Sequence, residues 1–225
     1  MDNLIVRAVS GFAFLMLVLS VALFVPAGSV HFWQAWVYLG VFAGCSLLIT
    51  AYLIRNNRQL LADRVKAGPI AEPQRTQQLL QSLAGLLFIA LFVVCGLDVR
   101  FGWSDVPPLA SLLSDGLVTL GFYVVFLTFR ENSYCRSTIE VSAGQQVITS
   151  GPYGLVRHPM YAGAALLLVF TPVALGSWVA VFCAIVLILV IVVRLLNEER
   201  FLRAHLSGYK EYCQQVRYRL VPFVW

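Results

Sequence analysis

The sequence predicts an all-α, polytopic membrane protein with about six transmembrane helices. Of its 225 residues, 60% are hydrophobic and only 12% are charged, whereas soluble domains carry about 25% charged residues. Asp, Glu, Lys and Arg are absent from four segments, residues 8–54, 76–97, 116–129 and 158–193. A helix rises about 1.5 Å per residue, so about 20 apolar residues cross the hydrocarbon core. These uncharged segments therefore locate the spans.

Four spans are predicted in the first half of the chain. Pro26-Ala27-Gly28-Ser29 is typical of a turn and divides the first uncharged segment into two spans. A basic cytoplasmic loop is expected at residues 55–78, and Pro107-Pro108 precedes the last span of this half. The four predicted spans lie at about residues 4–25, 33–54, 79–97 and 109–129.

The last uncharged segment predicts a helical hairpin. Residues 159–193 as one helix would measure roughly 50 Å, against a hydrocarbon core of about 30 Å. The chain is therefore expected to fold back at Gly176-Ser177. Each arm is then near the shortest length that spans a bilayer, so full spans and a partly re-entrant pair both remain open. Residues 197–225 carry aromatic residues among cations and are predicted to form an interfacial amphipathic helix.

The distribution of basic residues predicts that both termini lie in the cytoplasm. With six spans and the N-terminus inside, all but one of the 16 lysines and arginines fall in inner segments, Arg100 being the exception. The positive-inside rule describes this distribution. The cations flank membrane segments and form no single patch, which argues against nucleic acid as a partner. An inner or plasma membrane is the expected location, and the oligomeric state stays open.

A polar segment before the hairpin is the first candidate for a functional site. Residues 131–156 are rich in Ser, Thr, Gln and Gly, and loops of this length are uncommon unless functional or disordered. His158-Pro159 is typical of a helix start, because proline at the first helical position loses no needed hydrogen bond. Exposed amides of that first turn would form an anion site. His158 and Tyr161 would share one face, as a functional pair or as part of an interfacial belt.

A second polar cluster lies at the far end of the hairpin. Arg194 and Glu198 are four residues apart, so they would share a face and could pair. The structural alternative is a snorkelling arginine in a surface salt bridge, which contributes little stability. Glu198 and Glu199 stand where the helix dipole and the anionic leaflet disfavour acids, so a compensating cation is expected. No metal site is predicted, because the five cysteines lie far apart and form no CxxC pair.

The order of these motifs resembles the isoprenylcysteine carboxyl methyltransferase family. The motifs are Gly151-Pro152-Tyr153, Arg157-His158-Pro159-Met160-Tyr161-Ala162-Gly163, the hairpin, Arg194, Glu198-Glu199, Tyr209-x-x-Tyr212 and Val221-Pro222. A similar C-terminal pattern occurs in membrane phospholipid methyltransferases. The resemblance covers about residues 130–225, which are interpreted as the catalytic, cofactor-binding region with the hairpin at 158–198. Residues 1–129 show only generic membrane spans and are interpreted as an N-terminal transmembrane region.

The resemblance implies S-adenosylmethionine as methyl donor, enclosed between the hairpin and the polar loop at the cytoplasmic face. The residues that it implies for cofactor contact are Gln145, Gln146, Val147, Ile148, Tyr153, His158, Pro159, Met160, Tyr161 and Glu198. Arg194 would face the methyl acceptor, and Arg194 and Glu198 are the implied catalytic residues. The acceptor would be lipophilic and would enter from the bilayer.

The identity of the acceptor stays open at the level of sequence. The resemblance favours a carboxylate, as in O-methylation of an isoprenylcysteine, with N-methylation of a phospholipid or another lipid as the alternative. A carboxylate is already ionised at pH 7, whereas an amine would need Glu198 or His158 as a base. Two alternatives come from other classes: an NADPH-dependent membrane reductase, since sterol reductases share a related C-terminal architecture, and a non-enzymatic membrane protein with Arg194 and Glu198 as a structural pair.

Overall fold

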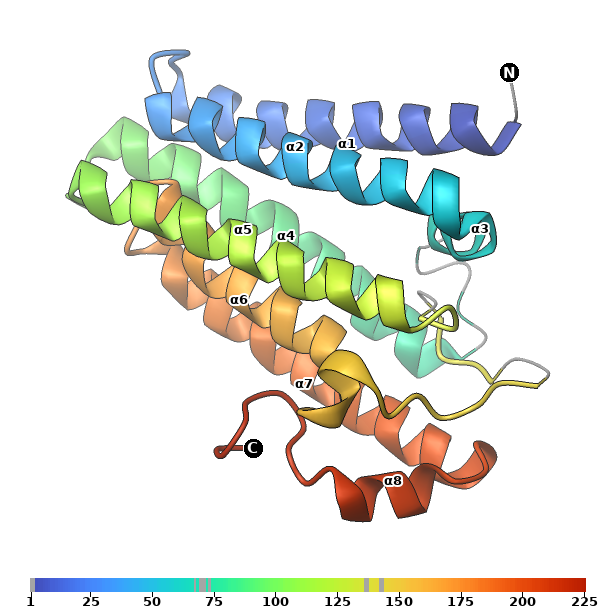
Figure 1. The fold of residues 1–225 in the computed structure, drawn as a ribbon. Coiled ribbons are helices and arrows are strands. Elements are labelled where there is room, and N and C mark those ends of the chain that lie inside the picture. The colour runs from blue at the N-terminus through green and yellow to red at the C-terminus, as the bar shows by residue number, and fades with distance from the viewer. Residues whose placement is uncertain (1–2, 67, 69–71, 73, 136–137, 142–143) are drawn as a thin grey trace.

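Long helices lie side by side in a bundle in the computed structural model, which describes residues 3–66, 68, 72, 74–135, 138–141 and 144–225. In Figure 1, α1 and α2 lie along one side, α4 and α5 in the middle, and α6 and α7 beyond them. The pairs α5 and α6, α1 and α4, and α4 and α7 make the most extensive contacts. The helices are α1 (Asn3–Ala27), α2 (Trp33–Asn56), α3 (Arg58–Val65), α4 (Arg75–Phe101), α5 (Pro108–Glu131), α6 (Pro159–Ala174), α7 (Ala180–His205) and α8 (Tyr209–Gln215).

The predicted all-α membrane architecture is confirmed. Within the described part of the chain, α1, α2, α4, α5 and α7 are long and apolar enough to cross a bilayer, and α6 is a shorter apolar helix. The hairpin differs from the expected pair of equal arms, because α6 has 16 residues and α7 has 26. At about 1.5 Å per residue, α6 falls short of the full hydrocarbon thickness. The start of α6 therefore lies deeper in the bundle than the end of α7.

The turn of the hairpin lies at Gly176-Ser177, as predicted. Gly176 has φ of +77°, a left-handed conformation that glycine adopts without steric cost. The buried hydroxyl of Ser177 donates to Asp98 Oδ2 and accepts from the N–H of Ala180 at 3.0 Å. Asp98 also accepts from the N–H and the hydroxyl of Ser104, at 2.8 and 2.7 Å. These hydrogen bonds attach the turn to the end of α4, so the hairpin is fixed at the end opposite to the polar loop.

Two glycines allow α5 and α6 to approach closely. A Cβ atom on Gly121 would lie 2.9 Å from the carbonyl oxygen of Gly163, and one on Gly163 would lie 2.8 Å from the carbonyl oxygen of Gly121. Small residues permit this kind of backbone contact between membrane helices. Gly163 belongs to the second turn of α6, so this contact holds the polar start of α6 against α5.

The predicted cytoplasmic loop at residues 55–78 is partly helical, which corrects the sequence-based interpretation. It contains α3 and the first turn of α4. Asn57 starts α3, because its side-chain oxygen accepts from the N–H of Leu60 at 3.0 Å. Leu60 and Leu61 are buried against α1 and α5 residues. An eight-residue helix is too short to be recognised by hydrophobic periodicity, and its stability depends on this tertiary contact.

The helix predicted over residues 197–225 is not continuous, while its position at the membrane interface stays a prediction. Helix α7 continues to His205, α8 has only seven residues, and the remaining chain returns to the start of α6. There the N–H groups of Arg157 and His158 donate to the carbonyls of Tyr218 and Arg219, at 2.9 and 3.0 Å. Some apolar side chains of the tail find partners within the protein, since Leu206, Tyr209 and Tyr212 form a buried cluster. The tail therefore packs over the polar loop, with Val141, Val147 and Tyr153 against this cluster.

Candidate functional site

A polar cavity lies at the end of the bundle where α5 ends, α6 begins and α7 ends. It encloses about 760 Å³, including space that is open to solvent. Its walls also include the loop after α5 and helix α8. All ten residues of the predicted cofactor set line it: Gln145, Gln146, Val147, Ile148, Tyr153, His158, Pro159, Met160, Tyr161 and Glu198. Residues 136–137 and 142–143 of the polar loop lie outside the described residues. The structure brings the predicted set around one space, while the role of each residue remains a prediction.

The loop wall of the cavity is held in place by Tyr153. Its phenol oxygen accepts from Asn132 Nδ2 at 2.8 Å, and its carbonyl accepts from the Tyr212 hydroxyl at 2.8 Å. A 3-10 turn at Gly151–Gly154 carries this residue. Burial raises the pKa of Tyr153 well above its ordinary value, so the phenol stays protonated at neutral pH. Tyr153 is thus suited to positioning and to hydrogen bonding, and it is no candidate for a base.

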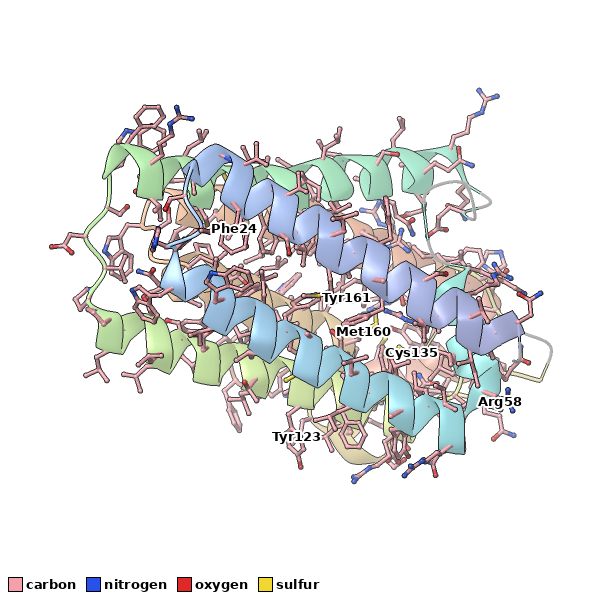
Figure 2. The ribbon with its side chains drawn as sticks, turned by 90° about the horizontal axis from the view of Figure 1, so that it is seen from above. Phe24, Arg58, Tyr123, Cys135, Met160 and Tyr161 are labelled. Atoms are coloured by element: carbon pink, nitrogen blue, oxygen red, sulfur yellow. The ribbon has the colours of Figure 1, made fainter. Side chains whose placement is uncertain are left out.

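Helix α6 begins at Pro159, which confirms the predicted start, and His158 is the residue before it. The ring of His158 lies 5.9 Å from that of Tyr161, as expected for residues on one face. Figure 2 shows Met160 and Tyr161 inside the bundle, with Cys135 beside Met160. The Cys135 thiol donates to the Met160 sulfur at 3.4 Å. The first turn of α6 therefore presents an imidazole, a thioether and a phenol to the cavity.

One hydrogen bond joins the two arms of the hairpin inside the site. The Tyr161 hydroxyl donates to Glu198 Oε2 at 2.6 Å. Charge-assisted hydrogen bonds of this length are stronger than neutral ones. Tyr161 is buried while Glu198 remains half-buried at the cavity wall. The carboxylate of Glu198 is consequently held at a defined point on the cavity surface.

Arg194 pairs with a residue that sequence reasoning did not consider. Its Nη2 lies 2.5 Å from Glu72 Oε1, and its Nη1 donates to Gln77 Oε1 at 3.1 Å. The hypothesis of an ion pair between Arg194 and Glu198 is therefore wrong. The carboxylate of Glu198 accepts from Tyr161, and Glu72 is only 2% exposed. A buried carboxylate needs a cationic partner more strongly than a half-buried one does.

Glu72 gathers several donors from distant parts of the chain. Its side chain also accepts from Gln81 Nε2 at 2.6 Å and from the N–H of Ile139 at 3.3 Å. These contacts connect the segment before α4 with α7 and with the loop after α5. In the sequence, Glu72 is one acid in a basic loop, and local spacing offers no signal that it approaches Arg194. Its partner is 122 positions away, so only the packing of α4 against α7 reveals the contact.

A second cavity of about 440 Å³ adjoins the first. Arg64, Gln81 and Arg194 line it from α3, α4 and α7. The residues that line both cavities are Thr138, Ile139, Met160, Tyr161 and Glu198. The hydrogen bond between Tyr161 and Glu198 therefore lies in the wall between two adjoining spaces, one polar and loop-covered, the other between helices.

Glu199 belongs to a separate ionic cluster. Its carboxylate lies 3.2 Å from Arg157, 2.6 Å from Arg203 and 2.8 Å from Arg219. The His158 imidazole is 3.9 Å away. The expected compensating cations are present, and the structure places them around Glu199 instead of Glu198. Glu199 thus connects α7 with the start of α6 and holds the C-terminal tail, through Arg219, against the site.

Two further polar side chains of the site, Cys135 and Tyr209, are neutral. Burial raises the pKa of the Cys135 thiol to about 11, so it is protonated at neutral pH and a poor nucleophile. Burial also raises the pKa of Tyr209 above its ordinary value. In the described part of the chain, no group of three or more His, Cys, Asp or Glu residues is placed to hold a metal ion. The acidic and basic side chains among the described residues that line the polar cavity include Glu140, Arg157 and Glu198.

The fold and the site together define an integral membrane protein with a polar cavity at one end of a helical bundle. Residues 109–208, from α5 to the residue before α8, match the protein-family model for phospholipid methyltransferase. A region of 106 residues is 31% identical to the Delta(14)-sterol reductase TM7SF2 of Mus musculus. That alignment covers 44% of this chain, and the chain spans 25% of the reductase. The family match supports the wider group of membrane methyltransferases, and the second similarity keeps a membrane reductase as the competing class.

Proposed function

We propose that this protein is a membrane methyltransferase that uses S-adenosylmethionine and methylates a lipophilic acceptor, with a carboxylate as the favoured acceptor group. The observation that carries the proposal is the pair of adjoining cavities separated by Tyr161 and Glu198. A donor in the polar cavity and an acceptor beside Arg194 would meet at this wall. The match of residues 109–208 to phospholipid methyltransferases supports the donor and a lipid-like acceptor.

The side chains of the polar cavity fit S-adenosylmethionine. Glu198 can accept hydrogen bonds from an ammonium group or from ribose hydroxyls. Gln145 and Gln146 offer amide donors and acceptors for an adenine edge, and both line the cavity. The first-turn amides of α6 favour a carboxylate, since a helix N-terminus carries partial positive charge. The Tyr161 ring is suited to a sulfonium cation, which aromatic faces attract.

The residues would act mainly through positioning. S-adenosylmethionine, when bound, supplies an electrophilic methyl group on its sulfonium. Tyr161 and Glu198 would align the two ligands across the shared wall, and Glu72 and Gln77 hold Arg194 on the acceptor side. Fixing two reactants in this way lowers the entropic part of the barrier. A carboxylate acceptor requires no general base, whereas an amine acceptor would require Glu198 or His158 to take its proton.

We also propose that the site faces the cytoplasm of an inner or plasma membrane, with both termini on that side. Arg55, Arg75 and Arg130 lie at those ends of α2, α4 and α5 that carry the site, and Arg100 lies at the opposite end of α4. The positive-inside rule then places the basic end inside. Labelling of single cysteines introduced beside Arg55 and beside Arg100, in intact and in permeabilised cells, measures this orientation. Labelling beside Arg55 in intact cells would contradict it.

A membrane reductase is the second candidate function. It is favoured by the 31% identity to a sterol reductase. A nicotinamide dinucleotide carries several phosphate groups, which arginine can bind in a bidentate manner. At the polar cavity, Arg157 is engaged by Glu199, and Arg194 on the neighbouring wall is engaged by Glu72. These existing pairs make the methyl donor the better fit to the cavity.

Ligand-dependent stability is expected to separate the two candidate functions. S-adenosylhomocysteine, the demethylated product of the donor, should raise the melting temperature of the purified protein in detergent. Ligand at 100 times its Kd adds about 2.7 kcal/mol to the stability of the native state. NADPH at the same concentration should have no effect. A shift with NADPH and none with S-adenosylhomocysteine would overturn the methyltransferase proposal in favour of the reductase.

Glu198→Gln is expected to weaken binding of S-adenosylhomocysteine by about tenfold or more, because a charged acceptor at the cavity wall is lost. Tyr161→Phe should have a smaller effect in the same direction, since it removes the hydrogen bond that orients Glu198. Isothermal titration calorimetry measures both affinities. Glu211→Gln is the matched control, because Glu211 is an exposed glutamate of α8. Equal affinities of the Glu198 and Glu211 variants would exclude Glu198 from donor binding.

A further inference from the structure

Arg64 places a cation in the second cavity without an acidic partner. Its Nη1 donates to the Met160 sulfur at 3.5 Å, and its guanidinium carbon lies 4.8 Å from the centre of the Phe129 ring. Both neighbours are uncharged. No ion pair of Arg64 with a carboxylate occurs among the residues that the structure describes. The half-buried guanidinium therefore keeps its full charge and most of its donors at the wall of this cavity.

Arg194, the other arginine of this cavity, is in a different electrostatic state. Its guanidinium is bound by Glu72 at 2.5 Å and by Gln77 at 3.1 Å. Releasing it to an incoming anion would leave the carboxylate of Glu72 buried without its cation. That exchange is unfavourable, because an unpaired buried charge is strongly destabilising. Arg194 therefore contributes little free positive charge to a ligand in this cavity.

The unpaired cation indicates what the cavity binds. The ion pair between Arg194 and Glu72 is neutral as a unit, whereas Glu198 keeps its negative charge on the wall shared with the polar cavity, where it accepts from the Tyr161 hydroxyl. Among the described residues that line this cavity, Arg64 is then the cation without a carboxylate partner. A guanidinium presents a planar set of donors that matches a carboxylate or a phosphate. An amphiphile with an anionic group next to its apolar chain fits this arrangement.

We propose that Arg64 binds the anionic group of the methyl acceptor and so determines acceptor specificity, while Glu72 holds Arg194 in the wall. The role of the bound anion as methyl acceptor rests on the proposed function. Anion binding at Arg64 does not depend on that function. Arg64 belongs to α3, outside the region 109–208 that matches phospholipid methyltransferases. Selection of the acceptor would thus be made by a part of the chain that lies outside the matched region.

Binding of matched amphiphiles tests the anion site directly. The probes are oleate against oleamide, and dioleoyl phosphatidate against dioleoylglycerol, each titrated into the full-length protein in uncharged detergent while thermal stability is followed. The wild type should prefer the anionic member of at least one pair. Preference for oleate indicates a carboxylate group, and preference for phosphatidate indicates a phosphate head group. Equal binding of both members of both pairs would overturn the proposal.

Arg64→Gln is expected to weaken binding of the preferred anion by about tenfold or more, which corresponds to loss of a charged hydrogen bond. Arg64→Lys should restore part of the affinity, since it keeps the charge and loses the planar donor set. Lys66→Gln is the control, because this exposed neighbour carries the same charge. Retained anion preference in Arg64→Gln, or an equal loss in Lys66→Gln, would refute the assignment.

Affinity for S-adenosylhomocysteine separates this proposal from the proposed function. All three variants should bind it as the wild type does, because Arg64 does not line the polar cavity. Loss of that affinity in Arg64→Gln would show a structural role instead of acceptor binding. If the wild type fails to bind S-adenosylhomocysteine but still selects the anionic amphiphile through Arg64, the methyltransferase proposal fails and the anion site stands.

Discussion

Glu199→Ala is expected to lower the free energy of unfolding by about 3–5 kcal/mol, the usual cost of leaving a buried charge without its partner. Glu199 is 3% exposed and Arg157 is 6% exposed, so the guanidinium of Arg157 would lose its counter-charge in a site that water reaches poorly. Arg203 is largely exposed and adds little to this value. Arg219 would also be released, and the tail would detach from the start of α6.

Glu198→Ala provides the control for this prediction, because it removes the same side chain from the next position. Its loss leaves only the neutral phenol of Tyr161 without an acceptor, so the melting temperature should fall much less. Thermal unfolding in detergent, followed by circular dichroism, measures both variants. The two neighbouring glutamates should thus have opposite phenotypes, with Glu199 required for stability and Glu198 for donor binding. Similar melting temperatures of the two variants would refute this division of roles.

Gly121→Ala is expected to destabilise the protein by about 1–3 kcal/mol, as over-packing of a tight contact does. The added Cβ would lie 2.8 Å from the Leu167 side chain and 2.9 Å from the carbonyl oxygen of Gly163. The backbone oxygen cannot turn away, so α6 must move as a whole. His158 and Tyr161 would move with it, and affinity for S-adenosylhomocysteine should fall together with stability.

Gly116→Ala on the same helix is the matched control. No atom lies within 4 Å of a Cβ at Gly116, and alanine is favoured over glycine in a helix by about 1 kcal/mol. The control should therefore be neutral or slightly stabilising. Melting temperature and ligand affinity, measured on both variants, show whether the α5 and α6 contact matters. Equal stability of the two variants would mean that the helices have room to separate.

The spans were predictable because they depend on length and on apolar composition. The expected spans at 4–25 and 33–54 correspond to α1 and α2 within a few residues. The turn at Gly176-Ser177 was predictable for the same reason, because a stretch of 35 uncharged residues is too long for a single transmembrane helix. Helix α3 could not be predicted, because eight residues carry too little periodicity. The course of the tail could not be predicted either, since the same aromatic residues suit a membrane surface and a protein surface.

The sequence predicted which residues line the candidate site better than it predicted which of them contact one another. The motif around His158 and Pro159 marks a helix start through local chemistry, and the structure has the start there. The pairing of Arg194 with Glu198 was wrong, because a spacing of four residues only brings two side chains within reach. Arg194 pairs with Glu72, which is more deeply buried than Glu198.

The amino-acid sequence by itself determined the membrane class, the hairpin, and the two polar segments that meet in the site, since these follow from hydrophobic length and from turn and cap chemistry. Tertiary structure alone decided that Glu198 faces the cavity while Glu199 holds three arginines, and that Glu72 binds Arg194. It also decided that Arg64 lines the second cavity. The physical reason is that burial and distance between remote segments determine which charges are compensated, and neither quantity is encoded in local spacing.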